Sequence, residues 1–415
     1  MKKLRKNVFL AAGFNTICLG TGRKEFNPKK PRPGLEHYIQ EAGKGVVSQL
    51  PSASLVDECV ISNFMAARFC RQGNLAGLMP TIDPALELKP STRVEGACGS
   101  GGLALYTGIK SVLAETADVV LVLGVEVQNT VKAIYGADYL AGAGHYATER
   151  KNGHAYFFPA KFSERAHAYG EKYGKERTRE GMAHWYAQAI EHARRCPQAQ
   201  EHHNETKDLL AAGMTPPNPA AFVESLNFFD CSKVSDDASA ILVCSEEGLG
   251  RIGMAAGKAA LVCGFGQSQA DLTRPPRDLT ELSTSRESVR KALEMAGIGP
   301  KSLGLLEVHD CFTITGLMAL AAIGVVPPGE AAGFVTAGKS KLGGELPTNS
   351  SGGLIGFGHA TGATGVRQAV DLLAQLTGQA GGCQAHVTPD RPYGLMISMG
   401  GNDKTVAAMS VKRAG

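Results

Sequence analysis

Cys98 lies in a run of small residues whose place in the chain suits a nucleophile. The run Val94–Gly102 follows an apolar, strand-like segment and leads at once into a helical pattern. The open N–H groups and the dipole of a helix start favour a thiolate over a thiol, and the small neighbours leave room for a substrate. The alternative is a buried cysteine that fills a tight turn, because free cysteines are commonly core residues.

Two later segments carry the groups that a thiol nucleophile needs. His359, in the Gly-rich stretch 356–365, is a suitable base near neutral pH. His309 and Cys311 follow the apolar run 303–306, where they could supply an oxyanion donor and an acid/base acting at carbon. Each segment alone also fits a structural role, either a turn histidine or a strand end capped by Asp310. Taken together, the two cysteines and two histidines predict one catalytic site.

The elements around these residues alternate between β-rich apolar runs and amphipathic helical stretches. This alternation predicts a layered α/β fold with mainly parallel strands. Strands are expected at 8–12, 58–61, 92–95, 119–127, 238–244, 259–264, 303–308, 395–399 and 406–411. Helices are expected at 34–50, 66–76, 162–173, 180–194, 286–296 and 362–376.

The order of elements divides the chain into two similar halves, residues 1–257 and 258–415. The first half includes a polar, His-rich and Pro-punctuated insertion at about 128–230, which we interpret as a loop domain over the α/β body. Phe157-Phe158-Pro159 and the lone Trp185 are expected to pack this insertion rather than bind a cofactor. Cys98 and His359 each precede a helix, so a pseudo-twofold arrangement would bring both to the interface between the halves, where α/β sheets form sites.

Composition excludes several classes of function. The chain has 415 residues, 43% of them hydrophobic, and a net charge of only +4 without a basic stripe, which argues against nucleic acid as a partner. The 10 cysteines show no metal or disulfide spacing, so we expect reduced thiols in a cytoplasmic protein without a bound metal. No apolar run approaches membrane-spanning length, and the basic start is interpreted as the lead of a first strand rather than a signal peptide.

Four motifs together resemble the thiolase superfamily, and most closely its sterol-carrier-protein-type branch, which includes acetyl-CoA acetyltransferase-like members. Cys98-Gly99-Ser100 is similar to the Cys-x-Ser nucleophile motif of that branch, and His309–Phe312 matches its His-Asp-Cys-Phe motif in full. Residues 358–363 match Gly-His-x-x-Gly-Ala, and Asn349–Gly353 resembles Asn-x-x-Gly-Gly. The similarity covers essentially the whole chain, and the four-residue match at His309–Phe312 is its most discriminating element.

The resemblance implies a five-layered α-β-α-β-α fold and a role for each motif residue. Cys98 would carry the acyl group, His359 would activate it, and His309 would join His359 in a first oxyanion hole. Cys311 would be the acid/base at the α-carbon, and the backbone N–H groups of Cys98 and Gly400 would form a second oxyanion hole. Coenzyme A and acyl-CoA would be substrates, no cofactor would be permanently bound, and the protein would form a homodimer or a larger oligomer.

The sequence departs from the thiolase pattern at two positions. Many thiolases have a second catalytic cysteine in a C-terminal Cys-x-Gly motif, which here is Ser398-Met399-Gly400, so the acid/base role should move to Cys311. Ala360 stands where the usual motif has proline, as in members that work with a small partner carrying a zinc ribbon and an OB-fold. The resemblance therefore implies such a partner subunit.

The predicted reaction is cleavage of a 3-oxoacyl-CoA by CoA, or the reverse Claisen condensation. The sequence does not distinguish straight-chain, branched and aromatic acyl groups. Catabolism of a branched or aromatic 3-oxoacyl-CoA is one metabolic role that fits the sequence. The alternatives are a C–C condensing synthase of the same superfamily and a non-catalytic CoA-binding subunit, the latter motivated by the missing C-terminal cysteine.

Overall fold

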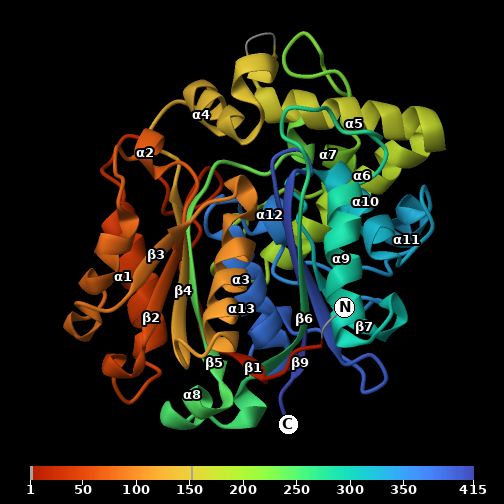
Figure 1. The fold of residues 1–415 in the computed structure, drawn as a ribbon. Coiled ribbons are helices and arrows are strands. Elements are labelled where there is room, and N and C mark those ends of the chain that lie inside the picture. The colour runs from red at the N-terminus through yellow and green to blue at the C-terminus, as the bar shows by residue number, and fades with distance from the viewer. Residues whose placement is uncertain (1–2, 151–152) are drawn as a thin grey trace.

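The strands form two half-sheets that meet along one short seam. The computed structural model describes residues 3–150 and 153–415 (Figure 1). The sheet order is β3-β2-β4-β5-β1-β6-β9-β8-β7, and β1 pairs with β6 through only two residue pairs, Phe9 with Leu261 and Leu10 with Ala260. The first half-sheet contains β3 (Ser91–Val94), β2 (Glu58–Ser62), β4 (Val119–Val127), β5 (Asp236–Ser245) and β1 (Val8–Asn15). The second contains β6 (Ala260–Gln269), β9 (Thr405–Arg413), β8 (Tyr393–Gly400) and β7 (Leu303–Glu307).

The expectation of mainly parallel strands is wrong. Only β2 with β3, β2 with β4, and β7 with β8 pair in parallel among the described strands; the other neighbouring pairs are antiparallel. The reason is partly local, since β8 and β9 are joined by a turn of four residues, 401–404, and parallel strands need a longer crossover. Every expected strand is nevertheless present, with bounds shifted by a few residues.

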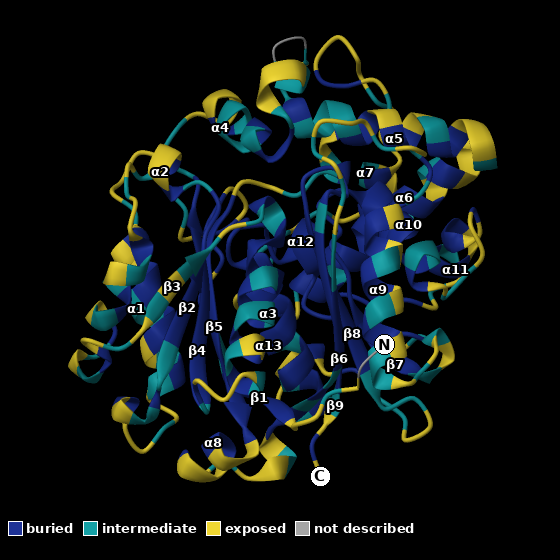
Figure 2. Ribbon diagram, viewed as in Figure 1, coloured by how far each residue is buried: buried dark blue, intermediate teal, exposed yellow. Residues whose placement is uncertain are grey.

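Helices cover both half-sheets and fill the space between them, which confirms the five layers that the resemblance implied. Helix α1 (Leu35–Val47) packs on the outer face of the first half-sheet, while α9 (Ser283–Ala296) and α10 (Thr313–Ile323) pack outside the second. Helices α3 (Ser100–Leu113) and α13 (Thr364–Leu376) share one apolar core with strands of both half-sheets. Figure 2 shows the strands and α13 largely buried, with exposed residues on the outer helices and loops.

The insertion lies across one end of both half-sheets (Figure 1). It contains α4 (Ala133–Leu140), α5 (Phe157–Tyr173), α6 (Lys175–Ala193) and α7 (Leu209–Gly213). Trp185 of α6 packs so closely on α10 that a Cβ at Gly316 would lie 2.2 Å from its indole ring. Phe157 and Trp185 are packed as expected, but Phe158 and Pro159 line a cavity. The remaining short helices are α2 (Ala66–Phe69), α8 (Glu246–Arg251), α11 (Ala331–Thr336) and α12 (Gly353–Gly356).

The helix expected at 66–76 is wrong beyond its first turn. Helix α2 ends at Phe69, and Arg71 and Asn74 have φ values of 56° and 48°. These left-handed backbone conformations are incompatible with a continuing α-helix. Within the described part of the chain, no helix has the length and apolar character needed to cross a membrane.

Candidate active site

The four predicted side chains come together at one cavity of about 340 Å³. Cys98, His309, Cys311 and His359 all line it, although they come from segments as far apart as residues 98 and 359. The Cys98 sulfur and one ring nitrogen of each histidine lie within 4.8 Å of one another. The two imidazole rings are perpendicular, with an interplanar angle of 87° and centroids 5.0 Å apart. The sequence therefore identified a true spatial cluster.

The cluster forms because α3 and α13 begin side by side. A Cβ at Gly101 would lie 2.7 Å from the backbone N of Gly365, so two glycines allow the helix starts to touch. Cys98 precedes α3 in a short 3₁₀ turn, Ala97–Gly99, and His359 lies five residues before α13. Ala97 has a φ of 55°, a left-handed conformation that non-glycine residues adopt mainly at constrained sites. This turn places the Cys98 side chain at one end of the helical layer between the half-sheets, where it lines the cavity.

Hydrogen bonding assigns His359 the tautomer of a base. Its Nδ1 lies 2.8 Å from Thr364 Oγ1, and that hydroxyl donates its single proton to the Ala360 carbonyl at 3.0 Å. Thr364 can therefore only accept from the histidine, so Nδ1 carries the proton and Nε2 has a free lone pair. Nε2 is buried without a hydrogen-bond partner among the described residues. It is free to take the thiol proton of Cys98.

His309 has the opposite tautomer. The backbone N–H of Met399 donates to its Nδ1 at 3.3 Å, so Nδ1 must be the unprotonated nitrogen. The proton is then on Nε2, which is also buried and lacks a partner within the described chain. His309 thus offers an N–H donor to the cavity, which is what an oxyanion requires.

All four reactive groups are neutral at rest. Burial, with a smaller contribution from the Glu126 carboxyl, raises the pKa of the Cys98 thiol to about 12. Burial lowers the pKa of His359 to about 3 and holds the pKa of His309 well below its usual range. The expectation that a helix start makes Cys98 a resting thiolate is therefore wrong, because desolvation outweighs the nearby N–H donors. Proton transfer from Cys98 must accompany its attack on a substrate.

Cys311 is a second buried thiol at the same cavity. Its sulfur lies 4.0 Å from Thr315 Oγ1, and burial raises its pKa well above the usual value, with the neighbouring Cys98 raising it further. Ser398, by contrast, does not line the cavity: its Oγ accepts a hydrogen bond from the Gly102 N–H at 3.3 Å, on the α3 side of the strand. The geometry therefore favours Cys311 over Ser398 as a group that can reach a substrate.

The backbone near Cys98 provides further donors. The N–H of Gly401 approaches the Cys98 sulfur together with that of Cys98 itself, and both lower the pKa of the thiol. Gly401 lines the cavity, whereas the predicted Gly400 ends strand β8 directly beside it. A Cβ at Gly99 would lie 3.1 Å from the Gly400 N, so this N also faces the Cys98 turn.

Two supporting roles were not predicted from the sequence, those of Glu126 and Asp310. Glu126 of β4 is fully buried and accepts hydrogen bonds from Thr361 Oγ1 at 2.9 Å and from the Gly362 N–H at 3.1 Å, which anchors the His359 loop to the first half. Asp310 accepts from Trp185 Nε1 at 2.9 Å and so ties the His309 loop to the insertion. A signal for Glu126 exists in the sequence, namely one acid in an otherwise apolar strand.

Asn349, noted in the sequence only as part of a motif, clamps the end of β7. Its side chain accepts from the Val308 N–H at 2.7 Å and donates to the Val308 carbonyl at 3.2 Å. Its φ of 54° lies in the left-handed region, which asparagine tolerates better than most residues. The clamp fixes the backbone immediately before His309.

The wall of the cavity opposite the polar groups is aromatic. Two stacked pairs, Phe162 with Phe312 and Phe222 with Phe228, each have ring centroids 4.5 Å apart. Most of the rings come from the insertion, so this region shapes much of the pocket. The aromatic lining residues are Phe69, Tyr156, Phe158, Phe162, Phe222, Phe228 and Phe312.

Cys98, His309 and His359 are also the one group of described side chains with donor atoms close enough to hold a metal ion. Sulfur and imidazole are suitable ligands for zinc. An ion bound there would occupy the Cys98 sulfur and one ring nitrogen of each histidine, and would therefore compete with the chemistry that the tautomers support.

Comparison with known proteins identifies the family. The model described as "Thiolase, N-terminal domain" matches residues 36–247, and "Thiolase C-terminal domain-like" matches residues 266–410. This chain belongs to the thiolase family. It is by family an acyltransferase, and the resemblance seen in its motifs is confirmed.

Individual relatives support the same assignment. The acetyl-CoA acetyltransferase of Methanothermobacter thermautotrophicus (strain Delta H) is 32% identical over 89% of this chain and 92% of its own length. Benzoylsuccinyl-CoA thiolase subunit BbsB of Thauera aromatica is 28% identical over 72% of this chain and 74% of its own. The solved Ltp2-ChsH2(DUF35) aldolase has the same fold, with a TM-score of 0.79, 20% identity and 99% coverage of both chains.

Proposed function

We propose that this protein is a catalytic thiolase that transfers an acyl group through a thioester on Cys98. The observation that carries the proposal is the pair of opposite tautomers beside Cys98, one Nε2 able to accept a proton and the other able to donate a hydrogen bond. A non-catalytic CoA-binding subunit would have no need of this arrangement. That alternative was motivated by the missing C-terminal cysteine, but Cys311 lines the same cavity as Cys98 and provides a second thiol there.

In the degradative direction, His359 Nε2 takes the thiol proton as the Cys98 sulfur attacks the 3-oxo carbon of a 3-oxoacyl-CoA. The bond between C2 and C3 then breaks, and its electron pair leaves as the enolate of the shortened acyl-CoA. The enolate oxygen is held by Nε2–H of His309 and by the newly protonated His359, and Cys311 delivers a proton to the α-carbon. Each donor contributes about 3–4 kcal/mol, as for oxyanion donors in other enzymes.

The acyl group on Cys98 is then transferred to free CoA. The Cys311 thiolate takes the proton of the CoA thiol, whose sulfur attacks the acyl-Cys98 carbonyl. The carbonyl oxygen is stabilised by the backbone N–H of Cys98 and by that of Gly400, with Gly401 as the neighbouring donor that faces the cavity. The Cys98 sulfur leaves and regains its proton from His359, which restores the resting site.

The aromatic wall favours a branched or aromatic acyl group over acetyl. A phenyl ring buried among these side chains gains about 2 kcal/mol relative to an exposed one, whereas an acetyl group would leave most of the cavity unfilled. The size of the cavity, about 340 Å³, is in the range of small-molecule sites. We therefore propose an aromatic 3-oxoacyl-CoA as the preferred substrate, in a catabolic role.

The same proposal includes an assembly and a location. We propose a homodimer or larger oligomer, with the chain divided at 257/258 and a loop domain at about 128–230. A small zinc-ribbon/OB-fold partner is supported by Ala360 and by the DUF35 component named in the aldolase of the same fold. All ten cysteines are free, which suits the reducing cytoplasm.

The deciding experiment is intact-mass measurement after incubation with benzoylacetyl-CoA, with any co-purifying small subunit present. The wild type should gain the mass of one benzoyl group, and added CoA should remove it. Cys98→Ser should gain none, while Cys231→Ser, which changes another cysteine of the same cavity, should behave as the wild type. A wild type that never gains the acyl group would contradict the enzyme proposal, and an adduct that CoA never removes would point to the condensing-synthase alternative.

A further inference from the structure

A cavity of about 250 Å³, away from the catalytic one, is lined by two cysteines that take no part in the mechanism above. Cys196 follows helix α6 of the insertion, and Cys383 ends a short 3₁₀ turn, Gly381–Cys383, after α13. Gln198 and Gln379 line the same cavity and are exposed, so the cavity opens to solvent. A small water-soluble reagent can therefore reach the two cysteines.

The two cysteines are in contact although they come from distant segments. A Cβ at Gly382 would lie 3.0 Å from the carbonyl oxygen of Arg195, so the two backbones run close together. The Cys383 sulfur lies 3.9 Å from the His192 carbonyl oxygen, and the side chains of Cys383 and Cys196 are hydrogen-bonded. Both are free thiols in one small buried cluster. A disulfide forms from two thiols placed in this way.

Cys196 has the character of a nucleophilic thiol. The contact with Cys383 lowers the pKa of the Cys196 thiol, against the opposing effects of burial and of the Asp371 carboxyl. The same contact, together with burial, raises the pKa of Cys383. Burial raises the pKa of each of the other eight cysteines, including Cys98. One thiol of the pair is thus prepared to attack an oxidant and the other to close the bond.

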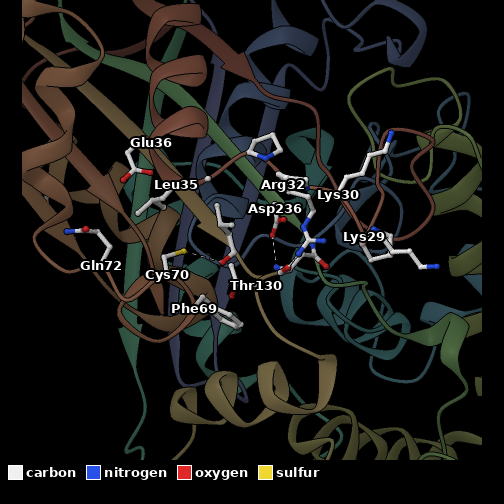
Figure 3. Close-up of a pocket in the computed structure, with 16 residues that line it drawn as sticks. Lys29, Lys30, Arg32, Leu35, Glu36, Phe69, Cys70, Gln72, Thr130 and Asp236 are labelled. Atoms are coloured by element: carbon white, nitrogen blue, oxygen red, sulfur yellow. Dashed lines mark hydrogen bonds between the residues drawn. The ribbon is translucent and has the colours of Figure 1, made fainter.

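Cys70 lacks a partner of this kind. It lines a cavity of about 520 Å³ beside the segment 28–33, and its sulfur donates to the Val127 carbonyl at 3.7 Å (Figure 3). No second cysteine lines that cavity within the described part of the chain, and burial raises the pKa of Cys70 to about 12. Cys70 therefore provides a matched control, a cavity-lining cysteine without a paired thiol.

The segment after Cys196 supports the loop that carries His359. The backbone N–H of Gln200 donates to the Phe357 carbonyl at 2.8 Å. The Gln200 side chain accepts from Ser235 Oγ at 2.6 Å, and that oxygen accepts in turn from the His359 N–H at 2.8 Å. Phe357 also packs in the same buried cluster as Cys196. A displacement of Cys196 is therefore transmitted to His359.

We propose that Cys196 and Cys383 form a redox-sensitive pair that peroxide converts into a disulfide, and that this disulfide slows acylation of Cys98. The Cys196 thiolate attacks one peroxide oxygen: an S–O bond forms, the O–O bond breaks and hydroxide leaves, so the sulfur is oxidised to a sulfenic acid and the peroxide is reduced. The Cys383 sulfur then attacks the sulfenic sulfur. The S–S bond forms, the S–O bond breaks, and the oxygen leaves as water with the thiol proton.

The disulfide acts on the catalytic site through distance. An S–S bond of about 2.05 Å is shorter than a hydrogen-bonded contact between two thiols, so its formation pulls the segment after Cys196 toward the turn Gly381–Cys383. The hydrogen bonds that Gln200 makes toward the His359 loop then lose their alignment. Only this effect on Cys98 rests on the proposed function, since formation of the disulfide does not require it.

The first test treats the reduced full-length protein with hydrogen peroxide, blocks the remaining thiols and maps the peptides without reduction. The wild type and Cys70→Ser should both yield a cross-linked pair of peptides joined at residues 196 and 383. Cys383→Ser should instead carry a sulfenic acid at Cys196, trapped by dimedone. Absence of the cross-link in the wild type, or oxidation of Cys70 as fast as that of Cys196, would overturn the proposal.

The second test measures the effect on the catalytic site. Acylation of Cys98 by benzoylacetyl-CoA should slow about tenfold in the oxidised wild type and recover with dithiothreitol, whereas peroxide-treated Cys196→Ser should keep its rate. An unchanged rate in the oxidised wild type, or an equal loss in Cys196→Ser, would contradict the switch. The nitrogen shifts of labelled His359 should also move on oxidation of the wild type and not of Cys196→Ser. The cross-link and these shifts can be read even if Cys98 is never acylated, so failure of the thiolase proposal is distinguishable.

Discussion

The loop after β7 and the loop before α13 each bring one histidine to Cys98, but they prepare the imidazoles for opposite tasks. In the first loop a backbone N–H from β8 occupies Nδ1 of His309, which leaves a proton on Nε2. In the second, a threonine oxygen occupies Nδ1 of His359, which leaves Nε2 as a base. The comparison shows that the partner of the remote nitrogen, rather than the residue type, assigns the role of a catalytic histidine.

The two loops are also held by different parts of the molecule. Asn349 and Trp185 hold the His309 loop, so it depends on the second half and the insertion. Glu126 of the first half holds the His359 loop, and Ser235 Oγ accepts its His359 N–H at 2.8 Å. Each half thus positions a group that acts on Cys98, and neither half could form the site alone.

The largest effect is expected from removing the base. His359→Asn should lower the rate of Cys98 acylation by on the order of 10³, because an amide cannot take the thiol proton. Single-turnover acylation, followed by intact mass, measures this directly. A loss of less than tenfold would mean that another group activates Cys98.

Substitution of Cys311, in the loop after β7, should separate proton transfer at carbon from acyl transfer. Cys311→Ser should leave acylation of Cys98 by an acyl-CoA within about tenfold, but lower exchange of the α-proton of acyl-CoA by about 10²–10³. Deuterium exchange followed by NMR is the measurement, with Cys231→Ser as the matched control. Full exchange in Cys311→Ser would contradict the assigned role and reopen the question of Ser398.

His309 is expected to act as a donor, so its substitutions should rank by donor ability. His309→Ala should lower kcat by about 10²–10³, as loss of one oxyanion donor does in other enzymes. His309→Asn keeps an N–H donor and should recover a large part of that loss. Equal losses in the two variants would mean that His309 acts through its lone pair, and would remove the distinction between the two loops.

Thr364→Val tests the assignment of the tautomers without touching a reacting group. The isosteric valine removes the oxygen that accepts from His359 Nδ1, so the imidazole should populate the inactive tautomer and acylation should slow about tenfold. Nitrogen chemical shifts of labelled histidine should report the change at His359 and none at His309. Unchanged shifts would contradict the hydrogen-bond assignment.

The smallest expected effect is that of pH. The pKa of His359 is lowered to about 3, so the base becomes protonated, and activity falls, only as the pH drops toward that value. The pKa of Cys98 is raised to about 12, so no gain from thiolate formation is expected below that pH. The kcat/KM of acylation should therefore be flat between about pH 5 and 9 in a buffer range where the fold is intact. A step near pH 6.5 would indicate a histidine exposed to solvent.

The candidate site was predictable to a large extent because its residues stand in short local patterns. Cys98 before a helix, His309 and Cys311 after a strand, and His359 in a Gly-rich turn are all recognisable one segment at a time. The resting charge of Cys98 was predicted wrongly, because a helix start is visible in a sequence and burial among residues from other segments is not. Glu126 was overlooked for the same reason, since its partners Thr361 and Gly362 lie more than 230 residues away.

The sequence by itself determined which segments are strands, where several of the helices lie, which segments carry the reactive side chains, and which family the chain resembles. Tertiary structure alone decided the antiparallel seam of the sheet, the tautomer of each histidine, the inward position of Phe158 and the contact between Cys196 and Cys383. The physical reason is the range of the interactions. Periodicity and helix starts depend on neighbouring residues, whereas burial, proton position and cavity shape depend on groups that only the folded chain brings together.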